Sequence, residues 1–244
     1  MKLLILADIH ANVTAFDAVM SQADKTYGAD LSIVHLGDAI DYGMRPNETL
    51  ERLNKLKGRM IVNLVGNHER AILGLDMDRF SSPRGAEACE FTRRILEPKW
   101  LDVFSSVMTS GPLTVEIGGR RILFVHGDHR DPFWGHMTGA EMAREVYREI
   151  DFVISGHTHI PVLKELFYPD QSANARRGKK KTVFINPGSV GQPRNHNAAA
   201  QYGVLDVATG SVCFGAVLYD TQKEMILYKG EIDPFYRDRL PIGV

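Results

Sequence analysis

Aspartate, asparagine and histidine recur in five short motifs over the first two thirds of the chain. Each motif holds side chains that can bind a divalent metal ion. In chain order, the motifs are Asp8-Ile9-His10, Gly37-Asp38, Gly66-Asn67-His68-Glu69, His126-Gly127 and Gly156-His157-Thr158-His159. One such motif alone is more often a turn or a helix cap than a binding site. Five of them in one chain indicate a shared site.

The chemistry of these side chains favours metals that accept both oxygen and nitrogen ligands. Carboxylate, imidazole and amide groups suit Mn²⁺, Fe or Zn²⁺, whereas Mg²⁺ usually takes fewer imidazoles. Seven donors are too many for one tetrahedral zinc ion, and they fit two ions about 3.5–4 Å apart that share a carboxylate. The candidate ligands are Asp8, His10, Asp38, Asn67, His126, His157 and His159.

The motifs follow short apolar runs that read as buried strands. These runs cover residues 3–6, 31–36, 60–65, 122–125 and 152–155. We expect helices from residue 14 and over 46–57 and 138–150, a hairpin over 113–125, a strand over 182–185, and short strands and turns from residue 202. This alternation indicates a parallel sheet, whose carboxyl edge would gather the five motifs. His35 lies inside a strand and is interpreted as structural.

Length and composition fit one globular domain over residues 1–244. The net charge of −1 predicts no general attraction to nucleic acid or membrane. Asp8 ends the N-terminal apolar run too early for a signal peptide, and no run reaches the ~20 apolar residues of a membrane span. Cys89 and Cys213 are interpreted as reduced thiols. We therefore expect a cytoplasmic protein, and self-association stays open.

The order of the motifs resembles the calcineurin-like metallophosphoesterases. Residues 37–43 and the segment Asn186-Pro187-Gly188-Ser189-Val190 are similar to the small bacterial and archaeal branch of that family. The resemblance implies a four-layer α/β/β/α sandwich of two mixed sheets flanked by helices. We expect the parallel strands to supply the edge that carries the site and the C-terminal strands to build the second sheet.

The resemblance also implies a role for each motif residue. One ion would be held by Asp8, His10 and His159, the other by Asn67, His126 and His157, and Asp38 would bridge them. A water or hydroxide between the ions would attack phosphorus in line. His68 is not a ligand in the family pattern, and would protonate the leaving oxygen or stabilise the charge of the transition state.

Other residues leave two interpretations open. Asn12 either contacts substrate or holds the loop after Asp8, and Arg194 either binds phosphate or is an ordinary surface arginine. Phe133 and Trp134 form an apolar lip or cover the core. Asp128 stands where the small branch often has a small residue. The basic stretch 169–181 is interpreted as a solvated loop, with a phosphate-attracting rim as the alternative.

The sequence therefore predicts a hydrolase of phosphate esters with two divalent ions, manganese favoured and iron or zinc as alternatives. By resemblance, a phosphodiesterase is favoured. The alternative is a phosphomonoesterase, including phosphatases of phosphoproteins or dinucleoside polyphosphates. A non-catalytic scaffold is disfavoured because His68 and every ligand position are intact. Nucleic acid is disfavoured as the main substrate because no additional binding element is present.

Overall fold

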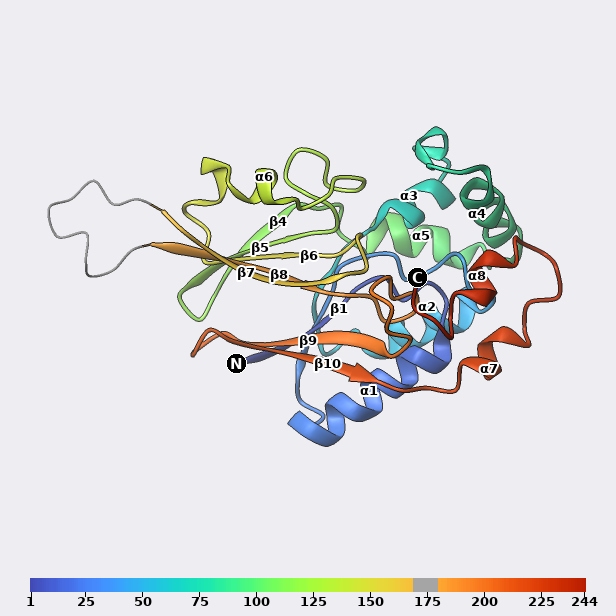
Figure 1. Cartoon of the computed structure of the whole chain (residues 1–244), viewed down its shortest axis with the longest axis horizontal. Helices are drawn as coiled ribbons and strands as arrows, with labels where there is room; N and C mark the ends of the chain where they lie inside the picture. The colour runs from blue at the N-terminus through green and yellow to red at the C-terminus, as the bar shows by residue number, and fades with distance from the viewer. Residues whose placement is uncertain (169–179) are drawn as a thin grey trace, which may run out of the picture.

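The structure is a computed structural model that describes residues 1–168 and 180–244. Two five-stranded sheets lie face to face, and helices cover their outer faces (Figure 1). Both sheets are mixed, as the sequence predicted, and together with the helices they form the four-layer sandwich. Most of the basic stretch, residues 169–179, lies outside the described residues.

The first sheet has the strand order β10-β9-β1-β2-β3. Within it β1, β2 and β3 are parallel, while β9 and β10 are antiparallel to their neighbours. The strand bounds are β1 (Lys2–Leu6), β2 (Ser32–His35), β3 (Met60–Asn63), β9 (Ala200–Asp206) and β10 (Ser211–Val217). The prediction that the C-terminal strands build the second sheet was wrong. Instead β9 pairs along β1, with Leu205 opposite Leu3, because an apolar strand pattern does not specify which edge it will join.

The second sheet has the order β4-β5-β6-β8-β7 and comes from the middle of the chain. Its strands are β4 (Leu113–Ile117), β5 (Arg120–Val125), β6 (Phe152–Ser155), β7 (Pro161–Phe167) and β8 (Lys181–Pro187). The predicted hairpin corresponds to β4 and β5, which turn at Gly118 and Gly119. Sequence analysis missed β7, because this edge strand is largely exposed and lacks the apolar run that marked the others.

Alternating side chains of β1 serve two cores. Leu3 and Ile5 pack between the two sheets, where they meet Phe124 and Ile154 of the second sheet. Leu4 and Leu6 point to the other face and pack against helices. Both faces of this strand are buried, which explains its unbroken apolar sequence.

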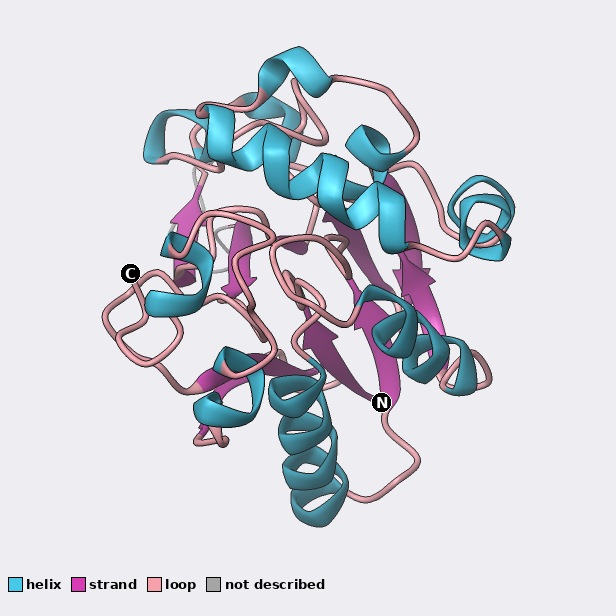
Figure 2. Cartoon of the chain, turned by 90° about the vertical axis from the view of Figure 1, so that its right-hand side faces the viewer, coloured by secondary structure: helices cyan, strands magenta, loops and turns pink. Residues whose placement is uncertain are grey.

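Helices cover both outer faces unequally. Long helices lie on the first sheet, and Figure 2 shows several of them around the end where the loops gather. The helices are α1 (Val13–Tyr27), α2 (Pro46–Lys55), α3 (Asn67–Ile72), α4 (Pro83–Ile95), α5 (Lys99–Ser106), α6 (Gly139–Met142), α7 (Thr221–Met225) and α8 (Phe235–Asp238), with 3₁₀ turns η1 (Met77–Arg79) and η2 (Glu145–Tyr147). Over the described ranges, no helix has the length and apolar character needed to cross a bilayer.

The helix predicted over residues 138–150 is the clearest error in secondary structure. Only α6 and η2 form there, because Arg144 between them has an extended backbone with φ −73° and ψ 141°. The break lets the ring of Tyr147 pack into the core beneath the second sheet. Its hydroxyl donates a hydrogen bond to Glu141 Oε1 (2.8 Å). Tertiary packing has therefore overridden helix propensity in this segment.

Candidate metal centre

All seven predicted ligands lie together at one end of the two sheets. Three parallel strands of the first sheet, β1, β2 and β3, and two of the second, β5 and β6, deliver them. The loops that follow these strands gather at the end of the molecule that faces the viewer in Figure 2. Three groups of mutually close donors result: Asp8 with His10 and His159, Asp38 with His126 and His157, and His10 with Asp38 and His68.

Sharp backbone turns aim these side chains into the cluster. Asp8, His10, Asp38, His157 and His159 all have φ between +48° and +66°. Non-glycine residues adopt this left-handed region at a cost of about 1–3 kcal/mol each when the structure holds them there. Hydrogen bonds between the loops do so, for example from Asp8 N to Gly37 O (3.1 Å) and from His10 N to Asp38 O (3.0 Å).

Glycines let the loops after β2 and β3 approach one another. Gly37 has φ +102°, and a Cβ on Gly66 would lie 2.1 Å from Asp38 Oδ1. No side chain fits at either position. The Gly-Asp and Gly-Asn pairs seen in the sequence therefore reflect close packing of two loops around the carboxylate of Asp38.

Backbone carbonyls fix the orientation of three imidazoles. The Nδ1 atoms of His10, His126 and His159 donate to the carbonyl oxygens of Ile40 (3.1 Å), Leu36 (2.8 Å) and Gln192 (2.6 Å). These bonds leave the Nε2 lone pairs facing the cluster. His10 Nε2 and His159 Nε2 lie only 3.2 Å apart, and two neutral lone pairs repel at that distance. A cation beside both nitrogens would remove the repulsion.

Oxygen donors complete the cluster. Asn67 Oδ1 lies 2.9 Å from both His126 Nε2 and His157 Nδ1, and Asp38 Oδ2 lies 3.1 Å from His126 Nε2. Asp8 Oδ2 is buried and has no hydrogen-bond partner among the described residues. A buried carboxylate oxygen without a partner is costly, and a metal ion would satisfy it. The residues therefore fit the binding of divalent ions.

The electrostatics of the cluster point the same way. Burial raises the pKa of Asp8 to about 7, and the nearby Asp38 carboxylate adds to the effect. For His126, burial acts to lower the pKa, but Asp38 outweighs it and raises the pKa to about 9. Burial holds the pKa values of His10 and His159 well below the usual value, so both are neutral. Neutral imidazole is the form that binds metals, so His10 and His159 are ready to bind an ion, whereas His126 has to release its proton when an ion binds.

His68 lies beside the cluster and has a carboxylate behind it. Its Nδ1 donates to Asp41 Oδ2 (2.6 Å), and Asp41 Oδ1 accepts from Thr92 Oγ1 (3.0 Å). Burial acts to lower the pKa of His68, but the carboxylates of Asp38 and Asp41 outweigh burial and raise it. Sequence analysis gave Asp41 no role. Its position three residues after Asp38, in the same loop, was the available signal.

Glu69 ties three loop amides together. Its Oε2 accepts from the backbone of Gly66 (2.7 Å) and Asp38 (2.9 Å), and its Oε1 accepts from Ala39 N (2.7 Å). The carboxylate thus fixes the loops after β2 and β3 against the start of α3. Glu69 is a positioning residue for Asp38.

A pocket of about 380 Å³ opens onto the cluster. Phe80 and Trp134 form part of its wall, with their rings edge to face at 5.3 Å. Phe80 also lies 5.3 Å from the His68 ring. Arg194 lines the pocket as well. The arrangement places cationic and aromatic surface beside a group of metal ligands.

Comparison with known proteins identifies the family. Residues 1–210 match the calcineurin-like phosphoesterase superfamily domain. The chain belongs to this superfamily. Its members hydrolyse phosphate esters with divalent metals, so the protein is a metal-dependent phosphoesterase, as the sequence predicted.

Several relatives match the phosphoesterase over its whole length. An uncharacterized protein of Methanocaldococcus jannaschii is 30% identical over 98% of this chain and 97% of its own. A metallophosphoesterase from Sphaerobacter thermophilus has a TM-score of 0.76 at 27% identity, and the match covers 100% of both chains. A hypothetical protein from Pyrococcus horikoshii has a TM-score of 0.80 at 20% identity over 100% and 98% of the two chains, which supports the fold.

Of the residues whose role the sequence left open, some line the pocket of the phosphoesterase and others only support its fold. Asn12 is buried away from the pocket: its Nδ2 donates to Gly191 O (3.0 Å) and Tyr219 Oη (2.9 Å), and its Oδ1 caps α1. These bonds favour the interpretation that it holds the loop, and leave its amide no free atom for substrate.

The side chains of the loop after β5 also differ in this respect: one lines the pocket and others support the fold. Trp134 reaches the pocket, whereas Phe133 packs against the core and under the guanidinium of Arg70 (4.2 Å). Asp128 closes its own turn by accepting from the amides of Arg130 (2.8 Å) and Asp131 (2.9 Å). Phe80 was not singled out from the sequence, because it lies in the irregular middle of the chain without a motif around it.

Proposed function

We propose that this phosphoesterase binds two divalent ions and hydrolyses phosphodiesters. Asp8, His10 and His159 would hold one ion, Asn67, His126 and His157 the other, and Asp38 would bridge them. The proposal rests on the position of Asp38, whose Oδ2 lies 3.1 Å from His126 Nε2 and 3.9 Å from His10 Nε2. The Asp38 carboxylate thus lies between the ligands of the first ion and those of the second, which is the position of a shared ligand in a dinuclear centre.

The metals and the protein divide the chemistry between them. When bound, two ions would supply a hydroxide nucleophile at neutral pH and would stabilise charge on the phosphoryl oxygens. His68 is the proposed acid: Asp41 holds its ring, the carboxylates of Asp38 and Asp41 raise its pKa against the effect of burial, and its Nε2 can donate to the leaving oxygen. Arg194 would bind a phosphoryl oxygen through its planar guanidinium.

The pocket supports a diester as substrate. Its volume of about 380 Å³ falls at the lower end of sites for small organic molecules, so it has space for a phosphate and the two groups that a diester carries. Phe80 and Trp134 offer apolar surface to one of these groups. A phosphomonoesterase is the alternative. Four further points stay predictions: that manganese is the native metal, that residues 1–244 act as one domain, that the protein is cytoplasmic, and that nucleic acid is not the main substrate.

Parallel assays test the proposal. With saturating Mn²⁺, we expect a higher kcat/KM for bis-p-nitrophenyl phosphate than for p-nitrophenyl phosphate. His68→Asn should lower kcat by roughly 10²- to 10⁴-fold while two ions per chain stay bound. His196→Asn is the matched control, because this histidine is exposed and its φ of +59° suits asparagine. Full activity of His68→Asn with both ions bound would contradict the role of His68, and cleavage of the monoester alone would favour the alternative.

A further inference from the structure

Two arginines beside the pocket have no counter-ion. Arg194 lines the pocket, and Arg239, just after α8, is only 6% exposed. In the part of the chain that the structure describes, neither side chain forms an ion pair or a hydrogen bond, and the Nε atom of each is buried without a partner. Arg239 is buried and Arg194 is half-buried, and a cationic group withdrawn from water without a partner is costly.

Other arginines of the protein do have acidic partners. Arg45 pairs with Glu224, and Arg59 pairs with Asp24 at 2.8 Å. Among the described arginines that are at least partly buried, the absence of an acidic partner is therefore confined to this corner of the molecule. Phe235 supports the guanidinium of Arg239 at 4.9 Å from its ring centroid, but an aromatic ring does not neutralise a cation.

The segment that carries Arg194 lies against the segment that carries Arg239, because Gln192 Nε2 donates to Tyr236 O (3.4 Å) and His196 N donates to Gly243 O (2.7 Å). Burial, and after it the charge of Arg194, lower the pKa of Arg239 to about 10. Arg239 therefore stays charged at neutral pH despite the unfavourable surroundings. An anion bound between the two guanidiniums would relieve both the repulsion and the missing hydrogen bonds.

A row of stacked rings leads from the metal ligands to this corner. Tyr42 stacks on His10 at 4.6 Å and on Tyr236 at 4.2 Å, and Tyr236 lies in α8, three residues before Arg239. Arg194 is near the ligands themselves, because its backbone amide donates to His159 O (3.3 Å) and it lines the pocket together with His157 and His159. Arg194 is thus placed for the phosphate that reacts, and Arg239 for a group further out.

We propose that Arg239, together with Arg194, binds a second, non-reacting phosphate next to the one that is hydrolysed. Preferred substrates would then be esters of diphosphate or longer phosphate chains, and this inference rests on the proposed function. In the reaction, the oxygen of one water bonds to phosphorus and one P–O bond breaks. The protons of the water end on the two products, and the phosphate at Arg239 is unchanged.

Binding of two nucleotides that differ by one phosphate tests this subsite. The inhibition constants of AMP and ADP are measured against bis-p-nitrophenyl phosphate with free Mn²⁺ held constant. For the wild type we expect ADP to bind about 10-fold more tightly than AMP, since a charge-assisted contact contributes about 1.4 kcal/mol or more. Arg239→Gln should bring the ratio close to one, and Arg239→Lys should keep part of it.

Arg237→Gln is the matched control, because this half-exposed arginine of α8 pairs with Asp238 instead. It should leave the ratio unchanged. Equal constants for AMP and ADP in the wild type, or an unchanged ratio in Arg239→Gln, would overturn the subsite. Thermal shifts with the same nucleotides measure binding without turnover. A protein that binds ADP through Arg239 but does not cleave the diester would contradict the proposed function and leave the subsite standing.

Discussion

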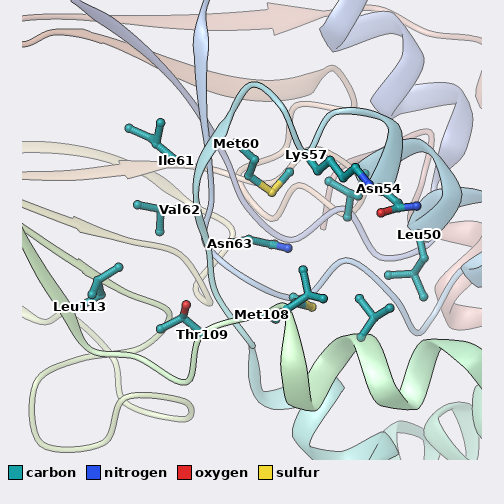
Figure 3. A pocket seen from close by; sticks show the side chains of 13 residues that line it. Leu50, Asn54, Lys57, Met60, Ile61, Val62, Asn63, Met108, Thr109 and Leu113 are labelled. Carbon is teal, nitrogen blue, oxygen red and sulfur yellow. The ribbon is translucent and has the colours of Figure 1, made fainter.

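Two pockets of the molecule differ in the backbone conformation and the polar partners of the residues around them. The first opens onto the metal ligands. The second, of about 200 Å³, lies at the edge of the first sheet between α2, β3 and the end of α5. Figure 3 shows Leu50, Met60 and Met108 around this second pocket. We call them the metal pocket and the apolar pocket.

The residues of the two pockets adopt different backbone conformations. Five ligands around the metal pocket have left-handed φ values, and Asp8 Oδ2 is buried without a partner. No residue that lines the apolar pocket has a positive φ. Leu53 and Met108 there have the ordinary role of packing. Pocket volume therefore says little about function, whereas conformations held at a cost mark the site that does chemistry.

The largest effect is expected at the bridging position. Asp38→Asn should lower kcat/KM more than about 10³-fold and reduce bound metal below two ions per chain, because a neutral amide is a poor shared ligand. Steady-state kinetics and metal analysis of the purified protein measure both. Asp30→Asn, at an exposed position, is the control. An Asp38→Asn enzyme with two ions and normal activity would remove the distinction between the pockets.

The apolar pocket should respond in stability alone. Leu53 is 5% exposed and packs in the main core. Leu53→Ala should lower the free energy of unfolding by about 3 kcal/mol, because it removes buried methyl groups and leaves a cavity. Urea unfolding measures the loss, and kcat should not change. Asn54→Ala, at the exposed neighbouring residue, should stay within about 0.5 kcal/mol. A fall in kcat for Leu53→Ala would mean that the two pockets are coupled.

Metal removal should destabilise the folded protein, and the effect should depend on the ligands of the metal pocket and not on the apolar pocket. Without ions, Asp8, Asp38 and Glu69 are acidic groups buried close together. Saturation at 100 times the dissociation constant adds about 2.7 kcal/mol, so Mn²⁺ should raise Tm of the chelated protein by roughly 5–10 °C. Differential scanning fluorimetry gives the shift. Leu53→Ala should show the same rise and Asp38→Asn a smaller one; equal rises in both would place the ions elsewhere.

The sequence predicted the metal pocket better than the scaffold around it. Strands β1, β2 and β6 are buried on both faces, and each ends at a ligand motif, so their runs could be recognised. By contrast, β7 carries the exposed residues Lys164 and Glu165 and has no such run. The partner of β9 could not be predicted either, because pairing with β1 is decided by contacts between strands almost 200 positions apart.

The sequence motifs also could not identify residues whose role depends on tertiary contacts. Asp41 acquires its role only when His68, 27 residues later, folds back onto it. Phe80 reaches the pocket, and Arg239 lies near Arg194 at its side, from segments with no local pattern. A motif records which side chains can bind a metal. It does not record which distant side chains hold or surround them.

His35 offers the smallest and sharpest test, because it lies in β2 close to the metal pocket and is expected to play no part in it. Its Nδ1 is paired with Asn63 Oδ1 at 2.8 Å, and burial lowers its pKa to about 4. Between pH 6.5 and 4 the unfolded chain gains a proton at this residue that the folded protein excludes. Stability is therefore complete above pH 6.5 and is lost as the pH falls, by about 2 kcal/mol between pH 7 and pH 5.

His35→Leu should flatten this dependence in urea unfolding of the chelated protein, whatever its effect on stability at pH 7. His196→Asn should keep the slope of the wild type. At pH 7 in Mn²⁺, His35→Leu should bind two ions as the wild type does, since no donor of the cluster depends on it. An unchanged slope would show that His35 is not held neutral by burial. Loss of an ion from His35→Leu would show that this residue of β2 contributes to metal binding.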